Sequence, residues 1–330
     1  MSNRKWNLGL LILFAVFVCL LLQFLFSALR IRGLVRDLEA HGAAGDKPRH
    51  VVLISQELDN PFWRSVEQGA AEASRQYGME LEYTGPSRIN AAEQVKPLEK
   101  AIAAKADAVL VQGIGDPQYR NLIDKAAAQG IPVIAVDTDE PGSKRLTYVG
   151  TDNLEAGKRM GELVAQSAGN AGTIGVMVGD QQENQKLRLE GFRSVIGRYP
   201  GLTITGVRSS NISRLQAEQQ GEDLLHRYPQ TGYMVGFSAL DGVGMLEAAG
   251  RIRSQGVRIF AFDDLEETKE AIRQCRIQAS VVQRPREMGF DAVSLLHDYY
   301  QGKTVPAQHF TAITVLDKSN VDGGNGEACR

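Results

Sequence analysis

The sequence predicts an α/β protein of two lobes that follow one membrane-spanning helix. Its 330 residues exceed the length of one typical domain. From His50 onward, short apolar runs alternate with amphipathic helical runs, the pattern of repeated βαβ units. Before them, the stretch from Leu8 to Leu29 contains no charged residue. These three observations together predict a tethered α/β body.

The composition excludes several classes of protein. A hydrophobic fraction of 43% and a charged fraction of 23% are ordinary globular values, unlike those of a disordered chain, a collagen or a multi-span membrane protein. The net charge of −2 argues against a nucleic-acid binder, which would carry a basic excess. Cys19, Cys275 and Cys329 are too few and too scattered for a disulfide scaffold or a zinc site. A bridge from Cys275 to Cys329 stays open, because it requires the C-terminal tail to fold back.

The apolar segment 8–29 is long enough to cross a membrane. About 20 residues span the hydrocarbon layer as a helix, whereas the apolar core of a signal peptide has roughly 7–15. Phe26 stands where a signal-peptidase cleavage site needs a small residue. Val18 precedes Cys19, where a lipoprotein signal also needs a small residue. We therefore expect an uncleaved anchor rather than a signal peptide, with residues 1–7 in the cytoplasm.

The segment 30–49 is predicted to be a stalk and linker. Leu29 to Ala40 has apolar residues at helical spacing, and a short Gly/Ala/Pro-containing stretch follows it. Basic residues occur on both sides of the anchor, so loop charge does not fix its orientation.

The body contains more predicted strands than one twisted sheet holds comfortably, which favours two sheets of about five strands each. Apolar runs such as 108–112 and 132–136 are typical of parallel strands covered on both faces. The predicted strands are Val51–Ser55, Glu80–Tyr83, Ala108–Gln112, Pro132–Val136, Thr173–Val178, Thr203–Val207, Gly232–Phe237, Val257–Phe262, Ile277–Val282 and Ala312–Leu316. The predicted helices are Asn60–Tyr77, Ala91–Ala104, Gln118–Gln129, Asn153–Ala168, Asn184–Arg198, Arg214–Arg227, Asp241–Ser254 and Arg286–Gln301.

Polar and aromatic residues follow many of these strands. Ligands bind at the carboxyl ends of parallel strands, so these positions are candidates for a site. Asp137 and Asp263 each come directly after an apolar strand, and Phe62 and Trp63 open the first helix. Any one of them could be a cap, turn or core residue. Together they predict a cleft whose carboxylates bind vicinal hydroxyls and whose rings cover the C–H faces of a sugar.

The motifs NPFW, DTD after PVIAV, VGTDN, LEGF, FAFDD and ASVVQRPREMG closely resemble the type I periplasmic sugar-binding proteins of the ribose-binding type. The resemblance covers about residues 50–317. It implies two Rossmann-like lobes joined by three hinge crossovers that close around a sugar. It places lobe 1 at 50–151 plus 284–312, lobe 2 at 152–283 plus 313–320, and a flexible tail at 321–330.

The resemblance also implies a ligand-binding set drawn from both lobes. Its members are Asn60, Phe62, Trp63, Asp137, Thr138, Thr151, Lys186, Arg214, Ser238, Phe262, Asp263 and Gln283. The chain departs from the ribose binders at four places: Thr138 and Lys186 each stand for an arginine, Ser238 for an asparagine, and Ile212 for an aromatic residue. Since arginine and lysine differ at bidentate sites, these departures leave the sugar open.

We therefore expect extracytoplasmic binding of a monosaccharide or similar polyol by a single-pass protein of the cell membrane. Its partner would be a sugar ABC permease or a membrane sensor histidine kinase. The first makes the chain a transport component, and the second makes it a sugar-sensing input subunit of a two-component system.

Two other functions are less favoured. The same family includes the effector domains of LacI-type repressors, but the DNA-reading helix of a repressor is not visible here. An enzyme acting on the sugar lacks support, because the sequence has no G-x-S-x-G, G-x-x-x-x-G-K-[ST], H-E-x-x-H or G-x-G-x-x-G motif. We expect no catalytic residue, no cofactor, no metal site and no nucleic-acid partner.

Overall fold

The computed structural model describes residues 47–330 apart from 170, 180, 253–255, 325–328 and 330, together with Gln23 and Ser27. The chain divides into two compact units, Met1–Pro48 and Arg49–Arg330, and the features below belong to the second. Apart from those two positions, the predicted N-terminus, the anchor at 8–29 and most of the stalk lie outside the described residues. Among the described helices, none is long and apolar enough to cross a membrane.

The first sheet gathers six strands from two distant parts of the sequence. Their order is β11-β5-β4-β3-β1-β2, and every pairing is parallel. The strands are β1 (Arg49–Ile54), β2 (Met79–Thr84), β3 (Ala108–Val111), β4 (Val133–Val136), β5 (Thr147–Thr151) and β11 (Gln308–Thr311). Every residue of β3, β4 and β5 is buried, so helices must cover both faces of the sheet.

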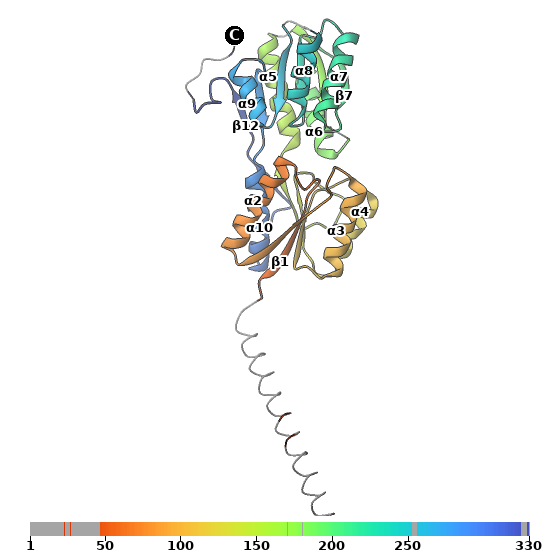
Figure 1. The fold of residues 1–330 in the computed structure, drawn as a ribbon, viewed down its shortest axis with the longest axis vertical. Helices are drawn as coiled ribbons and strands as arrows, with labels where there is room; N and C mark the ends of the chain where they lie inside the picture. The colour runs from red at the N-terminus through yellow and green to blue at the C-terminus, as the bar shows by residue number, and fades with distance from the viewer. Residues whose placement is uncertain are drawn as a thin grey trace, which may run out of the picture. The chain divides into compact units, whose positions relative to one another are not determined.

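Four helices cover this sheet, and we call the sheet with its helices lobe 1. They are α2 (Pro61–Gln76), α3 (Ala91–Ala103), α4 (Pro117–Ala128) and α10 (Pro285–Tyr300). Figure 1 shows α2 and α10 on one side of the sheet and α3 and α4 on the other. Asn60, Asn90 and Asp116 cap the first three of these helices with side-chain oxygens. The capping residues therefore fix where these helices begin, at the carboxyl edge of the sheet.

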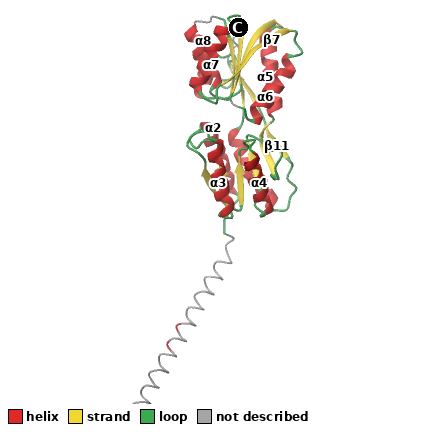
Figure 2. Ribbon diagram, turned by 90° about the vertical axis from the view of Figure 1, so that its right-hand side faces the viewer, coloured by secondary structure: helices red, strands yellow, loops and turns green. Residues whose placement is uncertain are grey.

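The second sheet, with its helices, forms lobe 2. Its strand order is β12-β10-β9-β8-β6-β7, and only β12 runs antiparallel to its neighbour. The strands are β6 (Ala171–Val178), β7 (Gly201–Ser209), β8 (Tyr233–Gly236), β9 (Arg258–Phe262), β10 (Ala279–Val282) and β12 (Thr314–Asp317). The helices are α5 (Asn153–Ala168), α6 (Glu183–Ile196), α7 (Arg214–Arg227), α8 (Asp241–Ile252) and α9 (Glu266–Arg273). Figure 2 shows α7 and α8 on one side of this sheet and α5 and α6 on the other.

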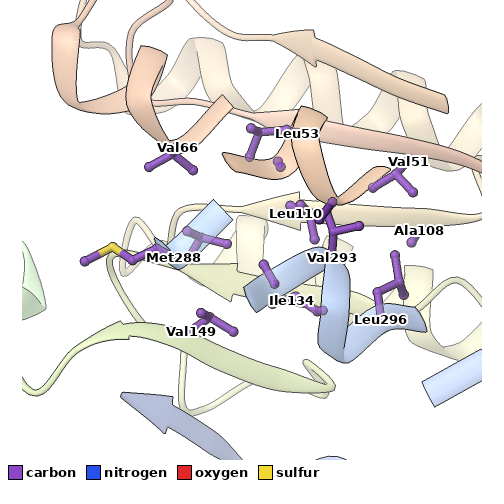
Figure 3. Close-up of a cluster of buried hydrophobic side chains, with 14 of the residues drawn as sticks. Val51, Leu53, Val66, Ala108, Leu110, Ile134, Val149, Met288, Val293 and Leu296 are labelled. Atoms are coloured by element: carbon purple, nitrogen blue, oxygen red, sulfur yellow. The ribbon is translucent and has the colours of Figure 1, made fainter. Parts of the chain in front are cut away.

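Apolar side chains of lobe 1 meet in a buried cluster (Figure 3). Leu53 of β1 and Leu110 of β3 lie on the face of the sheet that α2 and α10 cover. Val66 of α2 and Val293 of α10 complete the cluster, and all four side chains are fully buried. This packing joins the C-terminal helix α10 to the N-terminal half of the chain.

Pairs of glycines allow two sets of helices to approach closely. A Cβ at Gly69 of α2 would lie 1.8 Å from a carbonyl oxygen of α10, and one at Gly289 would lie 1.9 Å from a carbonyl oxygen of α2. In lobe 2, Gly157 of α5 and Gly191 of α6 have the same reciprocal relation, each 2.0 Å from a carbonyl oxygen of the other helix. Each helix that follows a passage between lobes is thus packed backbone to backbone on its neighbour.

The chain passes between the lobes three times, after β5, after β10 and after β11. The predicted two-lobe α/β fold is confirmed, but each sheet has six strands rather than about five. Strands β5 and β11 and helix α9 are not among the elements predicted from the sequence. Strand β11 reads QHFT and α9 reads EETKEAIR, so neither carries the apolar run on which the prediction depended.

The segment 321–330 is the one that the sequence predicted to be a flexible tail. The structure connects it to lobe 2 at three of its residues. Cys275, just beyond α9, forms a disulfide with Cys329 across 54 residues. Arg273 of α9 also pairs with Asp322, at 2.8 Å. Val321 packs against the apolar cluster beneath α8 and α9. The sequence left open whether Cys275 and Cys329 form a disulfide, and in the structure they do.

Candidate functional site

A cavity of about 70 Å³ lies at the carboxyl edges of the two sheets, with walls from both lobes. Its size suits a small molecule rather than a large cofactor. It is lined by Gln56, Asn60, Phe62, Trp63, Gln112, Asp137, Gln182, Asn184, Gln185, Arg188, Ile212, Ser238, Ala239, Asp263 and Gln283.

Two aspartates project into this cavity from equivalent strand ends. Asp137 follows β4 of lobe 1 and Asp263 follows β9 of lobe 2, with φ angles of 67° and 62°. In each case the backbone N–H donates to a carbonyl of the neighbouring strand, to Val149 at 3.1 Å and to Val281 at 2.8 Å. A left-handed conformation is uncommon for a residue other than glycine. The backbone of both aspartates is therefore strained, and its hydrogen bond to the adjacent strand keeps each carboxylate in place.

The first turn of α2 supplies an aromatic wall. The Asn60 side chain accepts a hydrogen bond from the N–H of Phe62 at 3.0 Å and so fixes the start of the helix. Trp63 is 1% exposed and belongs to the core of lobe 1, yet its ring also lines the cavity. Phe62 is half-buried, and its ring meets that of Trp63 edge-on at 5.9 Å. Both aromatics therefore reach the cavity.

Arg188 of α6 is the cation of this site. It is 2% exposed and donates hydrogen bonds to Asn153 at 2.7 Å, to Gln283 at 2.8 Å and to the Phe237 carbonyl at 2.8 Å. Its guanidinium lies 4.0 Å above the ring of Phe262. Phe262 therefore supports the arginine from below and does not line the cavity.

A buried aspartate shapes the lobe 2 loop that carries Ser238. One carboxylate oxygen of Asp241 accepts from the N–H groups of Phe237 and Ser238, and the other accepts from the hydroxyl of Ser210 at 2.6 Å. Burial is the main cause that raises the pKa of Asp241, and these hydrogen bonds oppose it. Asp241 is thus a structural group that presents Ser238 to the cavity.

Hydrogen bonds join the two lobes at the cavity. The side-chain amide of Gln112, just after β3, donates to the side-chain oxygen of Gln182 in lobe 2 at 3.1 Å. The same amide nitrogen lies 3.1 Å from Asp137 Oδ2. Asn184 of α6 lies 3.4 Å from that carboxylate oxygen. A lobe 1 carboxylate is therefore contacted by a lobe 2 amide across the cavity.

Three residues that line the cavity each carry a buried polar atom with no hydrogen-bond partner within the described protein. These atoms are Gln56 Nε2, Gln112 Oε1 and Ser238 Oγ. Their residues are 5%, 1% and 5% exposed. An unsatisfied buried polar group costs about 1–3 kcal/mol. The residues around this one cavity thus include a donor, an acceptor and a hydroxyl that can do either, each without a described protein partner.

The titration of Asp263 differs from that of an exposed carboxyl group. Burial raises its pKa to about 6, while the Arg188 guanidinium and the Gln283 amide oppose the shift. Gln283 donates to both carboxylate oxygens, at 3.1 and 3.3 Å. A change from neutral to acidic pH therefore alters the charge of the cavity.

The structure brings together seven of the residues that the sequence suggested: Asn60, Phe62, Trp63, Asp137, Ser238, Asp263 and Gln283. Thr138, Thr151 and Phe262 are buried but do not line the cavity; Thr138 is bonded to Gln112, and Thr151 to Gln283.

Lys186 and Arg214 lie elsewhere, which corrects their expected placement. Lys186 is on the solvent side of α6. Arg214 is the first residue of α7, and its side chain is 46% exposed and pairs with Glu247 of α8 at 2.6 Å. Arg188 occupies the place expected for the arginine of lobe 2.

Several lining residues were missed from the sequence. Gln112 directly follows β3 and Gln56 lies two residues beyond the end of β1, so position near a strand end was an available signal for both. Asn184, Gln185 and Arg188 recur at helical spacing on one face of α6, which identifies them once the phase of that helix is known.

A larger groove of about 620 Å³ lies beside the passages between lobes and shares Gln283 with the cavity. Four of its charged side chains pair with one another: Arg286 with Glu72 at 2.6 Å, and Arg284 with Glu287 at 3.8 Å. In the described part of the chain, His, Cys, Asp and Glu form no group that could hold a metal ion. The cavity is therefore the stronger candidate for a ligand site.

The sequence profile of the periplasmic binding protein domain matches residues 51–304. The chain belongs to this family. The match covers both lobes except for their last strands, and the two-lobe architecture with a cavity at facing sheet edges is that of a type I periplasmic binding protein.

Three known proteins illustrate the similarity. GanP, a glucose-galactose binding protein from Geobacillus stearothermophilus, is 35% identical over 84% of this chain and 100% of its own, with a TM-score of 0.81. XylFII, solved in a complex with LytSN, is 33% identical over 82% of this chain and 98% of its own, with a TM-score of 0.77. The ribose import binding protein RbsB of Bacillus subtilis is 23% identical over 266 residues, 79% of this chain and 85% of its own.

Proposed function

We propose that the chain binds a neutral monosaccharide, or a similar small polyol, reversibly in the cavity at the two sheet edges. The observation that carries this proposal is the set of unpartnered atoms, Gln56 Nε2, Gln112 Oε1 and Ser238 Oγ. Sugar hydroxyls donate and accept, so one small molecule can satisfy all three. Because the atoms come from both lobes, a bound sugar stabilises the approach of the lobes.

The remaining walls fit the same chemistry. Asp137 and Asp263 offer paired acceptors for vicinal hydroxyls, and charge-assisted hydrogen bonds of this kind are strong. Phe62 and Trp63 offer aromatic surface for the C–H face of a sugar ring. The names of the relatives support a sugar: glucose-galactose for GanP and ribose for RbsB. Since these sugars differ, they support the class of ligand and not one member of it.

The charges of the cavity favour a neutral sugar over an anionic one. Among the described residues, its lining contains two carboxylates and the Arg188 guanidinium, which already donates to three protein acceptors. A phosphate or carboxylate on the ligand would be repelled by Asp137 and Asp263, and it would have to compete with those acceptors for Arg188. We expect sugar phosphates and uronic acids to bind much more weakly than the parent sugars.

Binding without turnover is the expected activity. The proteins to which the chain is similar are named as binding proteins, which favours a non-enzyme. Asp139, two residues beyond Asp137, accepts hydrogen bonds from Arg145 through both carboxylate oxygens. It therefore has a structural role and is not available as a catalytic acid or base. Chemical change of a bound sugar during long incubation would contradict this part of the proposal.

The partner is a sugar ABC permease or a membrane sensor histidine kinase that responds to the approach of the lobes. Import binding proteins such as RbsB support the transport role. A second role, as a sensing subunit, is favoured by one observation: XylFII, 33% identical, occurs in a complex with LytSN. Co-purification of the membrane-embedded full chain, with and without sugar, would identify which kind of partner it retains.

The extracytoplasmic side is the proposed location, with 8–29 as an anchor in the cell membrane. The bridge between Cys275 and Cys329 supports it, because such disulfides persist in oxidising compartments. A phosphatase that is active only outside the cytoplasm, fused to the C-terminus, should be active. Activity of a cytosolic reporter fused at the same place would contradict the proposed orientation.

The binding proposal is tested on the full chain purified in detergent. D-glucose, D-galactose, D-xylose, L-arabinose and D-ribose are each added while thermal unfolding is recorded. A sugar at a hundred times its Kd adds about 2.7 kcal/mol to the free energy of unfolding and raises the melting temperature by several degrees. Asp263→Asn and Gln112→Ala should reduce the shift, whereas Arg214→Ala, outside the cavity, should retain it. No shift with any sugar or polyol would overturn the proposal.

A further inference from the structure

A chain of hydrogen bonds connects the two cavity aspartates through lining residues and through two buried residues outside the cavity. We call it the relay, and its members, in order, are Asp137, Tyr148, Asn153, Arg188, Gln283 and Asp263. It crosses from lobe 1 to lobe 2 at the passage between β5 and α5, and it ends on Asp263, the residue that follows β9. Two of its members, Tyr148 and Asn153, do not line the cavity.

The first half of the relay spans the passage after β5. The Tyr148 hydroxyl, at the lobe 1 side, lies 2.8 Å from the carbonyl oxygen of Asp137. The Asn153 side-chain amide, at the start of α5, donates to that hydroxyl at 3.4 Å. The Tyr148 hydroxyl also lies 2.9 Å from the carbonyl oxygen of Thr151, so its single O–H is shared between the two carbonyl oxygens. The Asn153 amide donates to the same Thr151 oxygen at 3.1 Å, next to the passage itself.

The second half lies in lobe 2. Asn153 Oδ1 accepts from Arg188 Nε at 2.7 Å, and Arg188 Nη2 donates to Gln283 Oε1 at 2.8 Å. Gln283 Nε2 then donates to Asp263 at 3.1 Å. Tyr148, Asn153, Arg188 and Gln283 are each at most 5% exposed. Buried polar networks of this kind act as a unit rather than as separate pairs.

A glycine makes the position of the tyrosine possible. A Cβ at Gly150 would lie 2.3 Å from the Tyr148 hydroxyl oxygen, because the ring folds back beneath the chain. Thus Tyr-Val-Gly-Thr, at 148–151, places a hydroxyl under the passage between lobes. A substitution of Gly150 disturbs the relay without altering any of its members.

We propose that Tyr148 and Asn153 are positioning residues that set sugar affinity from outside the cavity, by holding Asp137 and Arg188 in register across the passage between lobes. The inference rests on the proposed function, because it concerns the affinity of the same site. Asn153 fixes the guanidinium that orients Gln283, and Tyr148 fixes the backbone of Asp137. Removal of either member releases groups that contact the sugar.

The test begins with affinity. Calorimetric Kd values for the sugar of the five-sugar panel that binds most tightly are measured in the full chain and in Tyr148→Phe, Asn153→Ala and Gly150→Ala. We expect each variant to bind at least about fivefold more weakly, in the range of coupled neighbours. The matched control is Tyr119→Phe, since Tyr119 is a buried tyrosine of the same lobe whose hydroxyl is unpartnered in the described protein. Its affinity should equal that of the wild type.

A double variant separates positioning from a general loss of stability. Tyr148→Phe and Asn153→Ala interrupt the same relay, so the double variant should bind little more weakly than the weaker single variant. Multiplication of the two individual losses would indicate independent effects and would overturn the relay. Equal Kd values in all variants and the wild type would also overturn it.

A measurement without sugar keeps the relay and the proposed function distinguishable. Asp263 faces Arg188, Gln283 and Asp137; burial raises its pKa to about 6, and the Arg188 guanidinium opposes that rise. Asn153→Ala, by loosening Arg188, should raise the pKa of Asp263 in carboxyl NMR titrations, whereas Tyr119→Phe should not. If the wild type binds no sugar but this shift occurs, the proposed function fails and the relay stands. If sugar binds but neither Kd nor the titration changes in the relay variants, the relay fails and the function stands.

Discussion

Asp137 and Asp263 are structural counterparts, each held in a left-handed conformation at the carboxyl end of an inner strand of its own sheet. Each donates its backbone N–H to the adjacent strand, so the sheet that ends there also orients the carboxylate. One small molecule that contacts both therefore contacts both lobes.

The first prediction concerns pH and affinity. Burial raises the pKa of Asp263 to about 6. In the proposed site, its ionised form is the one that would accept hydrogen bonds from sugar hydroxyls. Affinity should therefore fall as pH decreases below about 6. Calorimetric titrations between pH 7.5 and 5 would measure this, and Asp263→Asn should bind weakly with a flatter pH profile. A wild-type Kd that stays constant across this range would contradict the assignment.

The same group should act on stability in the opposite direction. Its pKa rises from 3.8 in the unfolded chain to about 6 in the sugar-free fold. The stabilisation from this group is therefore fully present below 3.8 and is lost as pH rises through 6. In urea unfolding of sugar-free protein, Asp263→Asn should gain more stability over the wild type at pH 7 than at pH 5. An equal gain at both pH values would count against burial as the cause.

A further prediction compares variants of two arginines, Arg188 and Arg214. Arg188→Lys keeps the charge but loses the planar fork that reaches Asn153 and Gln283, so sugar affinity should fall more than about tenfold. Arg214→Lys alters a surface pair with Glu247 and should leave the affinity unchanged. Sugar calorimetry on both variants decides between them. A larger loss of sugar affinity in Arg214→Lys than in Arg188→Lys would indicate that Arg214, and not Arg188, is the arginine of lobe 2 that contacts the sugar.

The disulfide provides a stability prediction. A cross-link across 54 residues restricts the unfolded chain and adds about 4 kcal/mol in the chain-entropy account. Urea unfolding with and without a phosphine reductant should show a loss approaching this value. The double variant Cys275→Ser, Cys329→Ser should match the reduced protein and be insensitive to the reductant.

The glycine contact between α2 and α10 provides a packing prediction. Gly289→Ala places a methyl group 1.9 Å from a carbonyl oxygen of α2, so the helices must separate and stability should fall by about 1–3 kcal/mol. Gly250→Ala is the matched control, since this α8 glycine has open space around it and alanine should stabilise by about 0.4–1 kcal/mol. Urea unfolding of both measures the contrast.

The sequence predicted the fold well where it carries strong apolar runs. Strands such as β3 and β4, which are buried at every residue, could be predicted, and so could the capped helix α4 that follows β3. Strand β11 could not, because only its pairing with β5 shows that a half-exposed tetrapeptide belongs to a sheet.

The site was predicted where position along a strand suffices and was mistaken where helix phase decides. Asp137 and Asp263 come directly after strands, so their direction follows from the edge of the sheet. Lys186 and Arg188 are two residues apart on α6, about 200° around the helix, and only the packed structure shows which one faces the cavity. The relay was not foreseeable, because it depends on how Tyr148 folds under Gly150.

The bridge between Cys275 and Cys329 makes a covalent ring of the last part of the body. The ring leaves lobe 2 after β10, takes in α10 and β11 of lobe 1, and returns through β12. A protease that cuts the backbone once anywhere within it would release no fragment. Such damage would pass unnoticed on a non-reducing gel and appear as two pieces only after a thiol is added.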